Sequence, residues 1–174
     1  MANRTFSIGG VHPDDAKISR DCAIEALPLP GTVYISLAQH IGAPAKPVVA
    51  VGDKVKVGQP IAEPGGFVSA FIHSSVSGTV KSIGPRKDLA GNVQTYVEIA
   101  VEGDDWAEGI DRSEALVTDI PEDGKAIIEK IRLGGVVGLG GATFPTHVKL
   151  TPPPGKKCEM LIINGCECEP YLTS

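Results

Sequence analysis

Residues 52–63 read GDKVKVGQPIAE, and residues 72–80 read IHSSVSGTV. Apolar and polar residues alternate in both segments, which is the pattern of short, half-buried β-strands. The Gly-Asp pair in the first segment and the Ser-Gly pair in the second are typical of tight turns between strands. Further β-rich runs lie on both sides of these segments, at 32–37, 47–51 and 95–101. We therefore predict a small β-rich domain over residues 31–101.

The order of these two motifs resembles that of the lipoyl and biotinyl domain family, whose halves carry G-D-x-V-x-x-G-Q and S-G-x-V. The resemblance covers about residues 30–100 and implies a barrel-sandwich hybrid fold. Carrier members of that family attach their cofactor to a lysine on the hairpin between the two motifs. Here no lysine lies between Lys56 and Lys81, and the hairpin region reads GGFV at 65–68. The sequence therefore favours a structural or docking barrel over a carrier.

Size, charge and cysteine content exclude several classes of protein. The 174 residues are enough for one domain or two small ones, and a net charge of −5 argues against a nucleic-acid partner. The polar start at Met1 is unlike a signal peptide, and no apolar run approaches the roughly 18 residues of a membrane span. Three of the four cysteines lie within 158–168, which is a poor disulfide framework. We expect a soluble, intracellular chain.

A second informative stretch, GGVVGLGGATFPTHVKL, spans residues 134–150 and holds five glycines within eight residues. Pro145 suits the first turn of a helix, with Thr143 or Thr146 near the cap. A glycine-rich loop before a helix N-terminus is suited to binding an anion, and Lys149 lies about one turn into that helix. The alternative is a flexible interdomain loop. The spacing matches neither the dinucleotide motif G-x-G-x-x-G nor a P-loop, in which a serine or threonine would follow the lysine.

Two segments that flank the β-rich domain are predicted to lie outside regular secondary structure. Prolines in the sequence LPLP at 27–30 predict an extended arm over 1–30. The acidic segment 102–119 is predicted to be a linker, with Trp106 anchored by burial.

Residues 120–174 are expected to be the truncated start of an α/β domain. A helix is predicted from Pro121 to about residue 133, where Gly134 ends it, and a buried strand is predicted over 158–163. One helix, one strand and a loop do not close an α/β layer. We therefore predict an α+β chain that is the front end of a longer protein.

Polar residues follow the expected strand, where the strands of α/β sheets bind ligands. The amide of Asn164 both donates and accepts, which suits the edge of a flavin ring, and the carboxylates of Glu167 and Glu169 suit sugar hydroxyls. The alternative is an ordinary polar turn.

The clustered cysteines raise the question of a metal site. Cys166 and Cys168 are separated by one residue, whereas zinc pairs are usually separated by two to four. With Cys158 as a third ligand, the fourth would have to be His147, and an iron–sulfur site needs four cysteines. We expect no metal in this chain.

Three stretches in register resemble the RnfC family of the Rnf electron-transport complex. They are GGVHP at 9–13 with LPLP at 27–30 and QHIGAPA at 39–45, then GLGGATFPTHVKL at 138–150, then NGCECEPYLT at 164–173. The resemblance covers essentially the whole chain. It implies a peripheral subunit on the cytoplasmic face of the membrane, in a complex that moves electrons between ferredoxin and NAD and pumps sodium ions or protons. It also implies two [4Fe–4S] clusters in a C-terminal part that this sequence lacks.

The family's flavin domain is similar to the FMN subunit of respiratory complex I. Carried over by position, the expected FMN contacts are Gly138, Gly140, Gly141, Lys149, Asn164 and Glu167, and the expected NAD contacts are Phe144 and Glu169. In this scheme the glycines lie against FMN, Lys149 lies near its phosphate or ribityl chain, and Phe144 stacks on the nicotinamide. Two positions depart from the complex I pattern, with Leu139 in place of an arginine and Cys166 in place of an acidic residue. No catalytic side chain is assigned.

Two functions of different kinds are compatible with these features. In the first, the chain belongs to an oxidoreductase subunit that positions FMN between NAD(H) and electrons derived from ferredoxin, among the other Rnf subunits. In the second, the barrel is a non-catalytic docking module that holds a complex together. Flavin binding by the full-length protein distinguishes them.

Overall fold

The computed structural model describes residue 14 and residues 16–120 and 122–163. Residues Pro28–Lys157 form one compact unit, distinct from the two ends of the chain. This unit contains all the named strands and helices. Residues 23–30 contain neither helix nor strand and are exposed to solvent.

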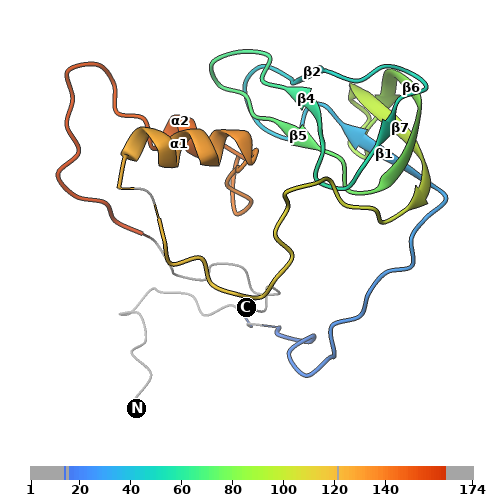
Figure 1. Ribbon diagram of the computed structural model, residues 1–174, viewed down its shortest axis with the longest axis horizontal. Helices are drawn as coiled ribbons and strands as arrows, with labels where there is room; N and C mark the ends of the chain where they lie inside the picture. The colour runs from blue at the N-terminus through green and yellow to red at the C-terminus, as the bar shows by residue number, and fades with distance from the viewer. Residues whose placement is uncertain (1–13, 15, 121, 164–174) are drawn as a thin grey trace. The chain divides into compact units, whose positions relative to one another are not determined.

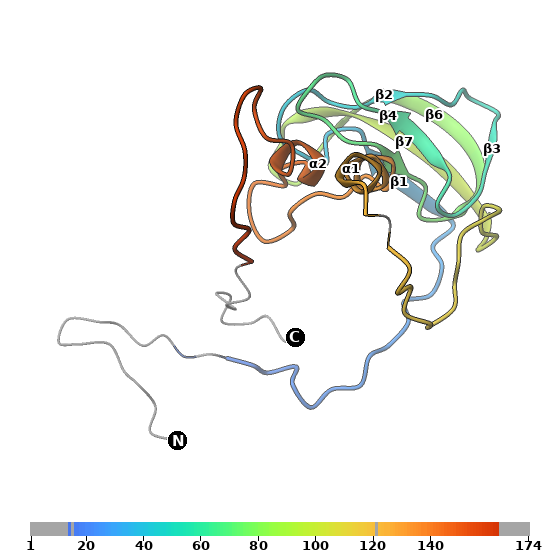
Figure 2. The ribbon, with the colours of Figure 1, turned by 60° about the vertical axis from the view of Figure 1, so that its left-hand side comes forward.

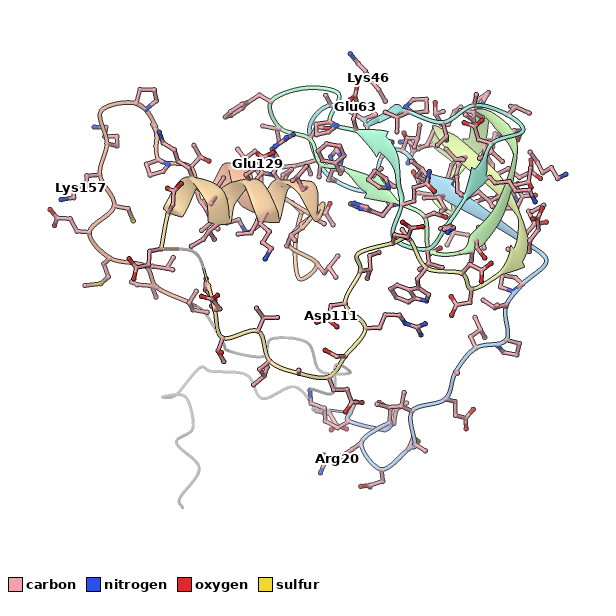
Figure 3. All side chains as sticks on the ribbon, viewed as in Figure 1. Arg20, Lys46, Glu63, Asp111, Glu129 and Lys157 are labelled. Carbon is pink, nitrogen blue, oxygen red and sulfur yellow. The ribbon has the colours of Figure 1, made fainter. Side chains whose placement is uncertain are left out.

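Seven strands make two antiparallel sheets (Figure 1). The larger sheet has the order β1-β7-β6-β3, with β1 at Thr32–Ser36, β3 at Lys54–Val55, β6 at Ser77–Lys87 and β7 at Val93–Gly103. The smaller sheet has the order β2-β4-β5, with β2 at Lys46–Pro47, β4 at Pro60–Glu63 and β5 at Ile72–His73. Lys46 and Glu63 are direct cross-strand partners in this sheet (Figure 3). This arrangement confirms the predicted β-rich barrel.

The core of the barrel follows from the alternation in the sequence. In β7, Val97 and Ile99 are fully buried, and they pair with Ile35 and Val33 of β1. Ile61 of the smaller sheet is also fully buried and belongs to the same apolar cluster. Since side chains in a strand alternate between two faces, the residues between these positions lie on the other face. The buried residues of both sheets, whose strands are drawn in Figure 2, therefore form one core.

The Ser-Gly motif at Ser77 and Gly78 has a packing cause. A Cβ atom on Gly78 would collide with the carbonyl oxygen of Ala100 in the neighbouring strand β7. The register of β6 shifts at this point, so the backbones come too close for a side chain. Here glycine is required by close approach rather than by a turn.

The β-run predicted at 47–51 is largely wrong, because only Lys46–Pro47 forms a strand. The Asp53 carboxylate accepts a hydrogen bond of 2.8 Å from the Ala50 amide, and the Asp53 amide donates to the Ala50 carbonyl at 3.1 Å. Residues 50–53 therefore form a turn closed by the aspartate, where the apolar pattern predicted the end of a strand. Val48 and Val51 are exposed as a result.

Trp106 is attached to the barrel through its backbone. The Val57 amide donates to the Asp105 carbonyl at 2.8 Å, and the Ala107 amide donates to the Val57 carbonyl at 2.9 Å. The indole itself stays 36% exposed, with the guanidinium of Arg112 4.6 Å from the ring centroid. The prediction that burial anchors Trp106 is therefore wrong, since backbone pairing does so.

Two helices follow the segment 104–120. The first, α1, spans Gly124–Leu133, and the second, α2, spans Thr146–Lys149. The Asp123 side chain caps α1 by accepting from the Lys125 amide, so the helix begins later than the predicted Pro121. Gly134 ends it as expected.

The strand predicted over 158–163 is not formed. Among the described residues it pairs with no other strand, and its apolar side chains are exposed, from 68% at Leu161 to 81% at Ile162. A strand needs a hydrogen-bonding neighbour, which local apolar pattern cannot supply.

The β4–β5 hairpin region leads to a prediction about covalent modification. The Gly65 amide donates to the Ser69 hydroxyl at 3.0 Å, and Phe67 is 79% exposed between them. No lysine is available there, so co-expression with biotin and lipoyl ligases should leave the intact mass of the chain unchanged. A carrier domain expressed in the same cells serves as the positive control. A mass increase equal to one biotinyl or lipoyl group would contradict this prediction.

Candidate functional site

The glycine-rich stretch forms a hairpin rather than a strand-to-helix loop. The Thr146 amide donates to the Val136 carbonyl at 3.0 Å, and the Gly138 amide donates to the Phe144 carbonyl at 3.1 Å. Between these bonds, Val137 and Pro145 form an isolated antiparallel bridge. The hairpin presents residues 138–144, hereafter the glycine loop, at its tip.

The helix after the glycine loop is shorter than the sequence suggested. It has four residues, its N-cap is Pro145, and no side chain caps it. The expected cap from Thr143 or Thr146 is therefore wrong: Thr143 has a left-handed φ of 51°, and its hydroxyl donates to the Ala142 carbonyl. A four-residue helix offers little dipole to an anion, so the features of this loop that suit an anion are its amides and the nearby side-chain charge.

The side chain of Lys149 reaches from α2 to the start of the glycine loop. A Cβ atom on Gly138 would lie 3.6 Å from the Lys149 ammonium nitrogen. In the described part of the chain, the amides of residues 139–142 donate no backbone hydrogen bond. The structure thus places the Lys149 charge beside Gly138, at the start of a loop whose next four amides are free of backbone hydrogen bonds, and both features are suited to a phosphate.

The two later glycines leave room for a flat ligand. A Cβ atom added to Gly140 or Gly141 would have nothing within 4 Å. Phe144 is half-buried, and its carbonyl closes the hairpin, so the backbone position of this expected NAD contact is fixed. Leu139 is 85% exposed at the tip. Asn164, Glu167, Glu169, Cys166 and Cys168 lie outside the described residues.

His147 is buried in α2 and was considered in the sequence only as a metal ligand. Its Nδ1 atom has no hydrogen-bond partner, and its side chain is 9% exposed. Burial lowers the pKa of His147, and the charge of Arg132 lowers it further, against the opposite effect of Glu129. Within the described residues, no three His, Cys, Asp or Glu side chains are placed to hold a metal ion.

A set of contacts at the base of the hairpin was not predicted from the sequence. The backbone of Gly135, with φ of 64°, lies against the carbonyl of Phe71. His73 of β5 forms a hydrogen bond with the backbone of Leu133, the last residue of α1. The only sequence signal for these contacts was the doubled glycine at 134–135, of which Gly134 was used as a helix stop.

An apolar cavity of about 330 Å³ lies beside α1. It is lined by Val117, Asp119, Ile120, Ile127, Lys130, Ile131 and Val136. The predicted apolar side of α1, with Ile127 and Ile131, therefore faces the segment 117–120. This cavity carries too little polar surface for a phosphate and is separate from the loop amides.

The lowered pKa of the half-buried His73 predicts a pH-dependent stability. Desolvation lowers the pKa of His73 below its ordinary value of 6.5, while the Leu133 hydrogen bond raises it. The unfolded ring therefore binds a proton at higher pH than the folded ring, so stability is full above about 6.5 and falls as the pH drops toward the folded pKa. The thermal midpoint should decrease between about pH 7.5 and 5, and His73→Gln should flatten this dependence. An unchanged pH profile in that variant would contradict the assignment.

Within the described residues, no helix is long and apolar enough to cross a membrane.

Comparison with protein families gives two matches, one N-terminal and one C-terminal. Residues 5–105 match the RnfC barrel-sandwich hybrid domain, and residues 131–174 match the Nuo51 FMN-binding domain. The second match contains the whole hairpin with its glycine loop and α2.

Curated relatives match over almost the entire chain. The C subunit of the proton-translocating ferredoxin:NAD(+) oxidoreductase complex of Clostridium ljungdahlii is 48% identical over 95% of this chain, and the Na(+)-translocating counterpart of Acetobacterium woodii is 43% identical over 95%. The C subunit of the ion-translocating oxidoreductase complex of Pseudomonas aeruginosa is 41% identical over 99%. The chain spans only 36%, 37% and 22% of the length of these relatives. The chain belongs to the RnfC family, and it carries that family's barrel-sandwich hybrid domain followed by a segment similar to the Nuo51 FMN-binding domain.

Proposed function

We propose that this chain is the N-terminal part of an FMN-binding subunit that passes electrons between ferredoxin and NAD in an ion-translocating membrane complex. The observation that carries this proposal is the glycine-loop hairpin, which lies within the segment similar to the Nuo51 FMN-binding domain. The names of the relatives in Clostridium ljungdahlii and Acetobacterium woodii support the reaction. Because those two relatives are named for different ions, the proposal does not specify the ion.

The residues of the glycine loop fit an FMN molecule in two respects. The unpaired amides of 139–142 and the Lys149 ammonium suit the phosphate, while the open space at Gly140 and Gly141 suits close approach of a flat ring. We assign Gly138, Gly140, Gly141, Lys149, Asn164 and Glu167 to FMN, and Phe144 and Glu169 to NAD.

The role of these residues is to bind and orient. Bound FMN would supply the exchange between hydride transfer at NAD and single-electron transfer to iron–sulfur clusters. Lys149 offsets the phosphate charge, the loop amides fix the phosphate position, and the fixed backbone of Phe144 sets where a nicotinamide ring can stack. We place the [4Fe–4S] clusters in the part of the subunit beyond residue 174, and the subunit at the cytoplasmic face of the membrane with its partner subunits.

The experiment is a flavin assay on the full-length subunit. Purified protein should contain about one FMN per chain, and NADH added without oxygen should bleach the flavin absorbance. The 174-residue chain alone should bind FMN much more weakly, because an α/β ligand crevice is built from several strand ends and an exposed phosphate contact is screened by salt. Full-length protein that assembles into its complex without flavin would favour the docking module instead.

A further inference from the structure

We propose that the barrel positions the FMN loop, through contacts between β5 with the residue before it, Phe71, and the chain segment 132–135 that leads into the hairpin. This inference rests on the proposed FMN function of the glycine loop. It gives the barrel a part in flavin binding that neither a carrier nor a simple docking module has.

The closest of these contacts is between backbones. Gly135 lies directly against the carbonyl oxygen of Phe71, and a Cβ atom on it would collide with that oxygen and approach the His73 ring at 3.3 Å. Gly135 also has a φ of 64°, in the left-handed region. Glycine is therefore required here twice, once for its conformation and once for its contact with the barrel.

Three side chains reinforce this contact. The Arg132 guanidinium carbon lies 5.2 Å from the centroid of the Phe71 ring, within cation–π range. Glu129, which projects from α1 (Figure 3), holds that guanidinium through two hydrogen bonds of 2.7 Å each. His73 forms its hydrogen bond with Leu133 at the end of the same helix.

The barrel side of the contact is anchored in the core. Ile72, between Phe71 and His73, is 4% exposed and belongs to the main apolar cluster. The Ala70 amide donates to Nε2 of the buried His40 at 3.1 Å. Because these residues are packed and hydrogen-bonded, β5 offers a fixed surface to the segment 132–135.

Backbone hydrogen bonds of consecutive residues connect Gly135 to the hairpin that carries the glycine loop. The Gly135 amide donates to the Arg132 carbonyl at 3.1 Å, and the next amide, of Val136, donates to the Ile131 carbonyl at 3.3 Å. The Val136 carbonyl then accepts from Thr146 and closes the hairpin. Displacing Gly135 from Phe71 must therefore move the base of the hairpin that carries Gly138 and Lys149. Gly135 and His73 act as positioning residues and do not touch the flavin themselves.

The test uses Gly135→Asn in the full-length subunit. Asparagine tolerates a left-handed φ, so this variant introduces the collision with Phe71 while limiting the backbone strain. The matched control is Gly91→Asn, since Gly91 has a φ of 87° and nothing within 4 Å of an added Cβ. FMN affinity is measured by quenching of free-flavin fluorescence, flavin orientation by visible circular dichroism, and loop order by hydrogen exchange at the Gly138 and Thr146 amides.

We expect Gly135→Asn to weaken FMN binding by about tenfold or more, to change the visible dichroism, and to speed exchange at both amides, with the barrel's thermal midpoint unchanged. Gly91→Asn should leave all of these unchanged. Wild-type affinity or wild-type amide exchange in Gly135→Asn would overturn the proposal.

The same measurements also cover two other cases, a Gly135→Asn variant that does not fold and a wild-type subunit that binds no FMN. If Gly135→Asn does not fold, His73→Phe removes the hydrogen bond to Leu133 but keeps a ring, and it should weaken FMN binding by about threefold and speed loop exchange. No change in that variant overturns the proposal. If the wild-type subunit binds no FMN, the proposed function fails, and the exchange of the loop amides alone then shows whether β5 holds the loop.

Discussion

Replacing Ile99 by Ala is expected to lower the free energy of unfolding of the barrel by about 2–5 kcal/mol. Ile99 is fully buried near the middle of β7, where it pairs with Val33 on one side and Val80 on the other. The substitution removes apolar contacts and leaves a cavity beside β7, which is hydrogen-bonded to β1 on one side and to β6 on the other. The barrel has little room to collapse into that space.

Urea denaturation followed by fluorescence measures this loss. Trp106 is the one tryptophan of the chain, and its backbone pairs with Val57, so its emission reports on the barrel. Val93→Ala is the matched control, because Val93 lies in the same strand but is 63% exposed. A cost below about 1 kcal/mol for Ile99→Ala, or equal costs for both variants, would mean that the core is not centred on β7.

Replacing Gly141 by Val is expected to abolish most FMN binding in the full-length subunit without unfolding it. An added Cβ at Gly141 meets nothing within 4 Å, so the variant should fold with a normal thermal midpoint. A β-branched side chain would nevertheless occupy the space in which FMN approaches the backbone. A loss of at least about tenfold in affinity corresponds to about 1.4 kcal/mol or more.

Lys149→Ala and Gly84→Val complete this series. Lys149→Ala removes one charge-assisted contact and should cost about 1–3 kcal/mol of FMN binding, with a salt dependence weaker than that of the wild type. Gly84→Val is the control, because Gly84 also has open space around its Cβ position but lies in β6 of the barrel. Flavin absorbance per protein should fall in the loop variants only. A folded Gly141→Val protein with its full flavin content would show that the loop is a linker.

Much of the barrel could be predicted from the sequence, because its determinants are local. Alternation placed Val97 and Ile99 on the inner face of β7. The tight turn predicted at the Ser-Gly pair is wrong, because Ser77 and Gly78 lie within β6 and Gly78 is needed for the close approach to Ala100. Two other failures have causes that the apolar pattern does not reveal, one of them local and the other a pairing with a distant segment. The Asp53 carboxylate turned the run at 47–51 out of the sheet, and backbone pairing rather than burial placed Trp106.

The sequence by itself also led to the proposed chemistry of the site, since glycine density and one lysine about a turn into the following helix favour a phosphate ligand. Only the tertiary structure decided the loop's form, a hairpin closed by Val136 and Thr146 with Lys149 folded back onto Gly138. It alone showed that Gly135 rests on Phe71, which belongs to a distant part of the chain. Contacts of this kind join segments far apart in sequence, and each depends on the backbone path of both partners, so no pattern within either segment encodes them.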